Sequence, residues 1–171
     1  MNVTVIVVEL LIMFLVFAFL VIGLLLINPV TFISDYPPEI QEVYYKSQNK
    51  EAEKEKLTTM MIVKKVVALI VFMFLFAWML HLAGAKTFIQ GLLLTYTYAI
   101  ALFAWDTFFL DWVLFANIKR IRLPGTEHMD GTEHMDKEYH QKWFHVKVCI
   151  PMIPVFAVVG VLSALIMIWI W

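Results

Sequence analysis

Four long runs of apolar residues dominate the chain, and two polar segments and one short turn separate them. A transmembrane helix needs about 20 predominantly apolar residues, because lipid offers no hydrogen-bond partners to an open backbone. The runs are too long and too uniformly apolar for barrel strands, which alternate over about 10 residues. The pattern therefore predicts an all-α fold in one membrane domain, with four transmembrane helices at residues 3–27, 66–85, 87–116 and 148–171.

The composition also indicates a membrane protein. Hydrophobic residues make up 62% of the 171 residues and charged residues only 16%, whereas soluble domains are about 45–50% apolar and about 25% charged. The net charge of −1 argues against a nucleic-acid partner. The single cysteine, Cys149, excludes an intrachain disulfide and a metal site made of several cysteines. The lipid bilayer is therefore the expected partner.

Lysine and arginine are distributed very unevenly along the chain. Twelve of the 13 lie in or beside the loops 28–65 and 117–147, and only Lys86 lies between the second and third spans. Positively charged loops stay on the cytoplasmic side of a membrane. We therefore expect both long loops to be cytoplasmic and both ends of the chain to face outward.

The first loop contains a short stretch with helical periodicity. Pro37 and Pro38 suit a helix start, and Ile40, Val43 and Tyr44 then share one face. This pattern predicts a short amphipathic helix. The helix either lies on the inner leaflet of the membrane or packs against the second loop.

The second loop contains an exact repeat, since GTEHMD occurs at residues 125–130 and again at 131–136. A loop that accepts six extra residues is typically a solvent-exposed tip. The loop also holds several side chains that could bind a metal: Glu127, His128, Asp130, Glu133, His134, Asp136, His140 and His145. Their spacing matches no closed zinc site, so we expect a solvated loop with no metal or cofactor. A haem shared by His81 and His145 is excluded, because the predicted spans separate them by about 30 Å.

Ionisable residues inside the predicted spans carry the most information about function. Glu9, His81 and Lys86 form a predicted outer polar cluster, whereas Asp106 and Asp111 lie toward the inner face. A charge at membrane depth costs about 2.5–3.5 kcal/mol, so such residues usually face a partner or a water-filled cavity. They either hold the helices together or line a functional site.

The spacing of the two aspartates separates their expected roles. On a regular α-helix, residues five apart point about 140° away from each other. Asp106 and Asp111 are therefore expected to have different partners. Asp106 is the better candidate for handling a proton or substrate, and Asp111 the better candidate for an anchor at the membrane interface.

The last third of the chain, with the DYPPEIQ segment of the first loop, resembles a group of small four-span bacterial membrane proteins. Their pattern is D-x4-D-W inside the membrane, then P-G-T-E, then Y…F-H-x-K before the last helix. The matching residues here are Asp106, Asp111, Trp112, Pro124, Gly125, Thr126, Glu127, Tyr139, Phe144, His145 and Lys147. The resemblance implies a multi-pass protein of a bacterial inner membrane, and it implies no particular reaction.

Two functional interpretations follow. In the first, the chain is a non-enzymatic integral membrane protein, a small transport or membrane-stress accessory factor, which acts alone, as a homo-oligomer or with a membrane partner protein. In the second, it is a membrane-embedded enzyme that acts on a lipid headgroup at the inner leaflet. Asp106 or Asp111 would then be catalytic, and the headgroup would contact the following side chains: Lys119, Arg120, Arg122, Glu127 and His145.

The distribution of lysine and arginine makes the topology testable. We expect cysteines introduced at Gln48 and Thr132 to react in intact cells only with a membrane-permeant reagent, because both positions lie in the predicted cytoplasmic loops. The measurement is accessibility labelling. Labelling of either position by an impermeant reagent would contradict this orientation.

Overall fold

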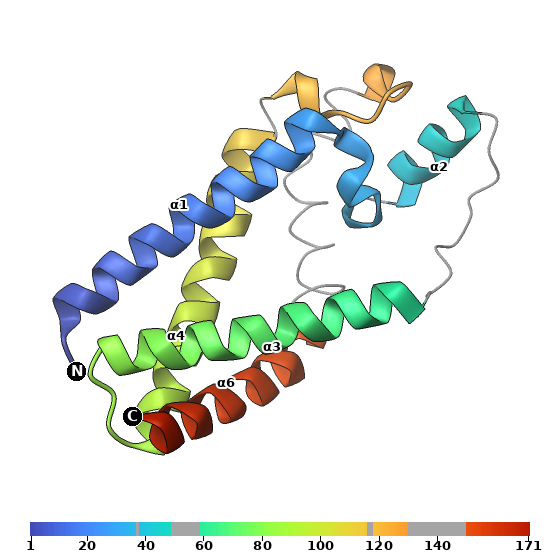
Figure 1. Ribbon diagram of the computed structural model, residues 1–171. Helices are drawn as coiled ribbons and strands as arrows, with labels where there is room; N and C mark the ends of the chain where they lie inside the picture. The colour runs from blue at the N-terminus through green and yellow to red at the C-terminus, as the bar shows by residue number, and fades with distance from the viewer. Residues whose placement is uncertain (37, 49–58, 116–117, 130–149) are drawn as a thin grey trace. The chain divides into compact units, whose positions relative to one another are not determined.

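The computed structural model describes five stretches of the chain, residues 1–36, 38–48, 59–115, 118–129 and 150–171. Within these stretches every regular element is a helix, and no strand occurs. Figure 1 shows the arrangement of the chain. The described residues include four helices that are long and apolar enough to cross a membrane, which confirms the all-α fold and the presence of four candidate spans.

The first long helix, α1 (Val3–Ile27), has the bounds that the sequence predicts. Its start is capped by Asn2, whose side-chain oxygen accepts the N–H groups of Thr4 at 3.1 Å and Val5 at 3.3 Å. Its end is set by Asn28 and Pro29, where the chain turns into the 3-10 helix η1 (Pro29–Asp35). A proline cannot continue the hydrogen-bond ladder of a helix interior, so the apolar run stops there.

The second long helix differs from its prediction at both ends. α3 (Thr59–Leu82) begins before the predicted residue 66, because the apolar residues 60–63 and the two lysines after them are also helical. It ends before the predicted residue 85, because Gly84 takes a φ of 77°, which closes the helix. The next helix, α4 (Phe88–Trp105), then starts at Thr87, whose hydroxyl accepts the N–H of Gln90 at 3.3 Å.

The expectation of one regular α-helix through residues 87–116 is wrong in its last third. After α4 the chain continues as the π-helix η2 (Asp106–Phe115). A π-helix bonds residue i to residue i+5, and short π segments are frequent at functional sites. The last span, α6 (Ile150–Ile170), is an α-helix close to the predicted 148–171.

The exposed surface of the long helices is strongly apolar. On α1, for example, the side chains of Leu15 and Phe19 are 68% and 79% exposed. Large contiguous apolar surfaces are rare on soluble monomers. Such surfaces suit contact with lipid, which fits the multi-pass membrane protein expected from the sequence.

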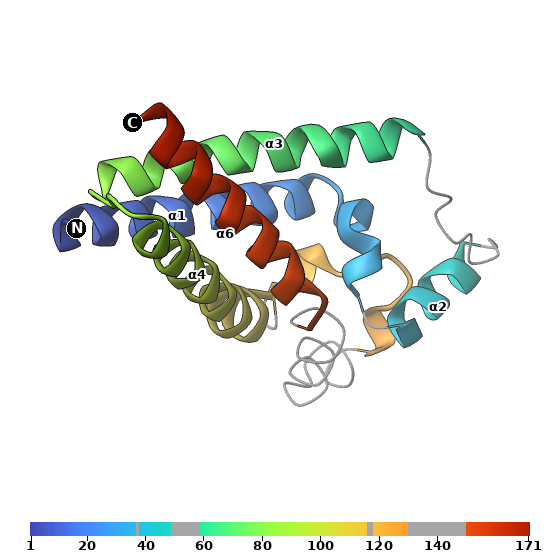
Figure 2. The same ribbon diagram turned by 90° about the horizontal axis from the view of Figure 1, so that it is seen from below.

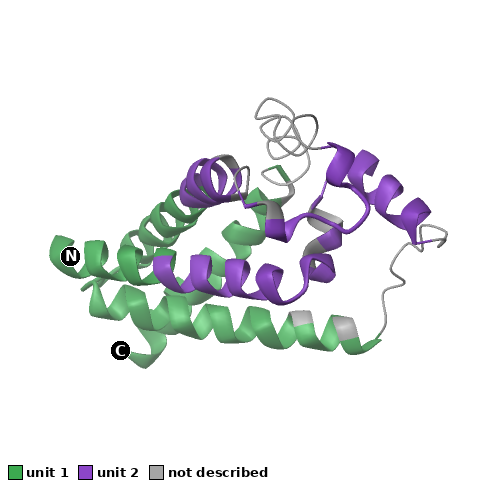
Figure 3. Ribbon diagram, turned by 90° about the horizontal axis from the view of Figure 1, so that it is seen from above, with its two compact units in different colours: residues 1–14, 57–103, 150–171 green, residues 15–56, 104–149 purple. Residues whose placement is uncertain are grey.

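The chain divides into two compact units, coloured separately in Figure 3. Unit 1 comprises Met1–Phe14, Leu57–Phe103 and Ile150–Trp171, and unit 2 comprises Leu15–Lys56 and Ala104–Cys149. Unit 1 therefore holds the first half of α1, most of α4, and α3 and α6. The single membrane domain expected from the sequence stays a prediction.

Three helix ends meet at one end of unit 1. The backbone N–H of Asn2 donates to the carbonyl of Ala83 at 2.8 Å, and the rings of His81 and Trp171 stack with centroids 5.0 Å apart. The start of α1, the turn between α3 and α4, and the end of α6 thus lie together, as Figures 1 and 2 both show. When four helices cross a membrane in alternating directions, the start of the first, the turn between the second and third, and the end of the last all lie on the same side.

Small residues let α4 and α6 approach closely within unit 1. A Cβ added to Gly91 would lie 3.0 Å from the Cβ of Ala164, and one added to Gly160 would lie 3.0 Å from Leu92 and 3.6 Å from Thr95. Helices in membranes associate mainly through such close packing, because lipid is as apolar as their side chains.

In unit 2, the short helix α2 (Pro38–Ser47) packs against the second loop. Ile40 and Tyr44 are buried in one cluster with Leu123 and Met129. The hydroxyl of Tyr36 also donates to the carbonyl of Ile121 at 2.7 Å. Of the two arrangements that the sequence left open for this helix, the structure therefore has the one in which its apolar face contacts the other loop.

The opposite face of α2 is exposed and charged. Glu42 and Lys46 form an ion pair of 2.7 Å one helical turn apart. The hydrogen bond and positive charge of Lys46 hold the pKa of the Glu42 carboxyl below its usual value. Exposed pairs of this kind contribute little to stability, so the buried face of α2, and not this pair, holds the helix in place.

Residues 126 and 129 of the first GTEHMD copy are buried, contrary to the expectation that this copy forms an exposed tip, although Glu127 and His128 between them are exposed. Thr126 is fully buried and its hydroxyl donates to the carbonyl of Leu123 at 2.7 Å, and Met129 belongs to the buried cluster. Gly125 has a φ of 85°, and a Cβ there would lie 2.5 Å from the Ser47 hydroxyl oxygen. The second copy, residues 131–136, lies outside the described residues.

We expect Gly125→Ala to lower the free energy of unfolding by about 1–3 kcal/mol, because an alanine is strained at a positive φ and its Cβ would clash with Ser47. Thermal unfolding in mild detergent measures the change. Gly23→Ala is the control, since a Cβ at Gly23 in α1 meets nothing within 4 Å. Equal melting temperatures for the two variants would contradict the packing described here.

Candidate functional site

A buried carboxylate lies within the first span. Glu9 is six residues into α1, about 9 Å along the helix axis, and its side chain is only 9% exposed. It is the only charged residue of α1. The helix is otherwise apolar, so insertion of this residue carries a cost of about 2.5–3.5 kcal/mol that a partner has to offset.

That partner is Tyr98 on α4. The Tyr98 hydroxyl donates a short hydrogen bond to the Oε2 atom of Glu9. Tyr98 is itself fully buried, and its ring stacks on that of Phe76 from α3, with centroids 6.4 Å apart. Three helices of unit 1 therefore meet at one polar pair.

The second carboxylate oxygen has no such partner. Among the described residues, none forms a hydrogen bond with the Oε1 atom of Glu9, although this atom is buried. The surroundings of the pair are apolar, since Ile6, Leu10 and Met13 of α1 pack against the cluster that contains Tyr98. One oxygen of the carboxylate is thus free to bind a further group.

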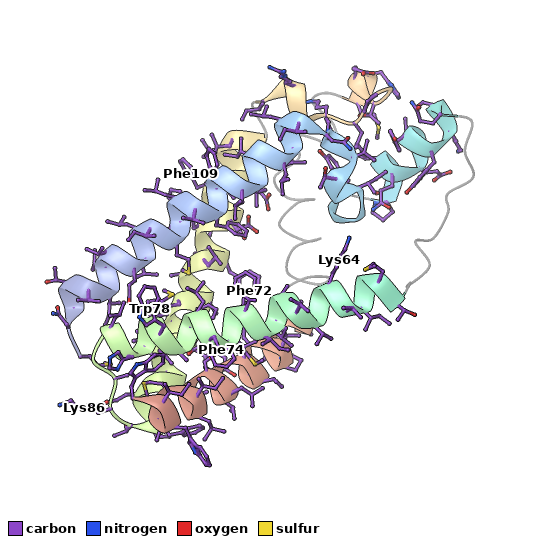
Figure 4. All side chains as sticks on the ribbon, in the orientation of Figure 1. Lys64, Phe72, Phe74, Trp78, Lys86 and Phe109 are labelled. Carbon is purple, nitrogen blue, oxygen red and sulfur yellow. The ribbon has the colours of Figure 1, made fainter. Side chains whose placement is uncertain are left out.

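The other two members of the predicted outer polar cluster make different contacts. His81 is exposed and stacks on Trp171. The backbone N–H of Lys86 donates to the side chain of Gln90 at 2.8 Å, and Figure 4 shows its side chain pointing away from the helices. Within the part of the chain that the structure describes, Glu9 pairs with neither of these residues.

The π-helix changes the geometry expected for Asp106 and Asp111. Both residues lie on η2 and both are half-buried. Because a π-helix bonds residue i to residue i+5, residues five apart lie on the same side, as residues four apart do on an α-helix. The expected divergence of about 140° is therefore wrong, since it assumed a regular α-helix.

The predicted headgroup ligands lie in several environments of unit 2. Lys119 begins the 3-10 helix η3 (Lys119–Ile121), Arg120 is exposed, and Arg122 is 8% exposed. Glu127 begins the 3-10 helix η4 (Glu127–Met129), and its carboxylate accepts the N–H of Gly125 at 3.0 Å. His145 lies outside the described residues.

No group of three metal-binding side chains occurs among the described residues. Of the possible ligands in the second loop, the structure describes Glu127 and His128, and both are exposed. The others lie at or beyond residue 130, outside the described residues. The expectation that the loop holds no metal stays a prediction.

Comparison with known proteins adds no relative. The chain matches no protein-family model, and no curated protein and no solved structure matches it either. The resemblance to small four-span bacterial membrane proteins therefore stays a prediction, and the interpretation of the site rests on its geometry.

The sequence indicated Glu9 as a candidate site residue but did not identify Tyr98 as its hydrogen-bond partner. Tyr98 is the last of four consecutive residues with a hydroxyl group, the others being Thr95, Tyr96 and Thr97. Thr97 is exposed and bonds its own helix backbone, to Leu93 at 3.0 Å. The signal that could have found Tyr98 is its position seven residues after Gly91, since both lie on the buried face of α4.

We expect Tyr98→Phe to lower the free energy of unfolding by about 1–3 kcal/mol, because the buried Glu9 carboxylate would lose its donor. The phenylalanine ring keeps the packing on Phe76. Tyr96→Phe is the matched control, because the Tyr96 hydroxyl forms no hydrogen bond with the residues described. Denaturation in detergent measures both variants. Equal losses would show that the Tyr98 hydroxyl does not support Glu9.

Proposed function

We propose that this chain is a small integral membrane protein of the transport type, either a transporter of its own or an accessory factor of one, in which Glu9 binds a small cation or a proton. The observation that supports this proposal is the buried Glu9–Tyr98 pair inside an apolar helix cluster. Carboxylates inside membrane spans commonly mark proton relays and ion pathways.

A purely structural role for Glu9 explains the pair less well. Polar residues can hold membrane helices together, at about 0.6 kcal/mol per hydrogen bond on average. A neutral glutamine or serine at position 9 could accept the Tyr98 hydroxyl without the cost of a buried charge. The presence of an acid at this position, with one oxygen unbonded to the described residues, therefore favours a group that binds and releases a ligand.

The distribution of charge supports an orientation for this site. Lysine and arginine in the two long loops favour a cytoplasmic location of these loops. The start of α1 lies with the turn between α3 and α4, which is the segment with a single lysine. In the proposed orientation Glu9 thus lies toward the outer face of the membrane. The resemblance implies that this membrane is a bacterial inner membrane. The proposal holds for a monomer, a homo-oligomer or a complex with a membrane partner protein.

We expect liposomes that contain the protein to dissipate an imposed gradient of protons, Na⁺ or K⁺ faster than protein-free liposomes, because Glu9 gives the ion a binding site inside the membrane. Ion-sensitive dyes inside the vesicles measure the decay. Glu9→Gln is expected to abolish the acceleration, whereas Glu42→Gln, at an exposed carboxylate of α2, is expected to keep it. Equal rates for Glu9→Gln and the wild type would contradict the proposal.

The second candidate is the enzyme acting on a lipid headgroup, and the π-helix favours it by bringing Asp106 and Asp111 to one side. The same liposomes test it, since their phospholipids are the substrates that such an enzyme would modify. A change in headgroup composition that Asp106→Asn abolishes would support the enzyme. Unchanged phospholipids with a flux that depends on Glu9 would exclude it.

A further inference from the structure

We infer that the ligand of the Glu9 carboxylate is a proton, which binds at Oε1 while Oε2 continues to accept the Tyr98 hydroxyl. This inference names the ligand of the proposed transport site and rests on the proposed function for its biological role. The binding step itself is simple: a hydronium ion delivers a proton to Oε1, an O–H bond forms, the negative charge disappears and a water molecule is released.

The set of atoms around Glu9 is too small for a metal cation. Ca²⁺ needs six to eight oxygen ligands and Mg²⁺ needs six in a strict octahedron. Within the described residues, Glu9 contributes one free oxygen, and the Tyr98 hydroxyl directs its hydrogen toward the carboxylate. No second acidic residue belongs to the sequences of α1, α3, α4 and α6. A proton, in contrast, needs a single lone pair.

Among the described residues, no basic side chain forms an ion pair with Glu9. The elements packed around it carry few titratable groups: α6 carries none, and α4 carries only Tyr96 and Tyr98. In α3, His81 is exposed at one end and Lys64 is exposed toward the other, as Figure 4 shows for Lys64. A buried carboxylate without a basic partner is neutralised most simply by protonation.

The arrangement of Glu9 and Tyr98 suits both the ionised and the protonated carboxyl group, and neither state requires the side chains to move. An ionised carboxylate accepts hydrogen bonds on both oxygens, whereas a protonated one keeps an acceptor oxygen and gains one O–H donor. Tyr98 can therefore donate to Oε2 in both states. Its ring is held against Phe76, so the donor stays in place when the proton leaves.

Infrared difference spectroscopy across a pH titration tests this inference, because a protonated carboxyl has a C=O stretch that the carboxylate lacks. We expect a C=O band in the wild-type protein that appears and disappears with pH, and its complete loss in Glu9→Gln. Glu42→Gln is expected to keep the band. Absence of any titrating band that Glu9→Gln removes would overturn the inference.

Two further measurements identify the atom and the ligand. If the proton sits on Oε1, Oε2 is the carbonyl oxygen that accepts the Tyr98 hydroxyl, so Tyr98→Phe should shift the band to higher frequency without removing it. Loss of the band on addition of Na⁺, K⁺ or Ca²⁺ at constant pH would show that a metal cation displaces the proton and would overturn the inference. An unshifted band in Tyr98→Phe would overturn the assignment to Oε1.

The spectra require no ion gradient, so they separate this inference from the proposed function. A titrating Glu9 band in a protein that carries no flux would sustain proton binding and remove the transport role. A flux that Glu9→Gln abolishes, without a titrating band, would sustain transport and remove the proton as the ligand.

Discussion

A buried carboxylate on an otherwise apolar helix has to find its hydrogen-bond donor within the protein, and this constraint organises unit 1. Glu9 fixes which face of α1 turns inward, because its donor is Tyr98 on α4. Tyr98 in turn packs on Phe76 of α3. One turn and two turns earlier on the same face of α4, Leu94 and Gly91 are buried, and Gly91 is where α6 approaches. The Glu9–Tyr98 pair thus lies where α1, α3 and α4 meet.

Unit 2 is held together differently, because its segments include short 3-10 helices and turns with few backbone bonds of their own. Side chains supply part of what the backbone lacks. Tyr36, Thr126 and Ser47 donate to backbone carbonyls of the second loop or of α2, and the Glu127 carboxylate accepts a backbone N–H. Buried backbone groups need such partners wherever regular structure is absent.

The sequence predicted the helices well where local chemistry decides the outcome. The apolar run and the Asn28-Pro29 stop defined α1 at both ends. The start of α3 was missed because two lysines at 64 and 65 interrupt the apolar run, although the apolar residues 60–63 before them continue the helix to Thr59. The π-helix was missed because no residue in Asp106–Phe115 marks a change of hydrogen-bond register. Glu9 was found as a lone charge, whereas its pairing with Tyr98 was not, because a contact between residues 89 apart in sequence depends on how the helices pack.

The close contact between Gly125 and Ser47 has a consequence for how this chain can vary in length. The two GTEHMD copies are identical, so loss of either one leaves the same amino-acid sequence, in which a glycine still follows Pro124. The glycine that contacts Ser47 is therefore restored by any whole-unit contraction or expansion of the repeat. Slippage during DNA replication, which adds or removes whole copies, would preserve the buried threonine and methionine, whereas a point substitution at the glycine would not. The packed part of the loop constrains the composition of the repeat and leaves its copy number free to drift.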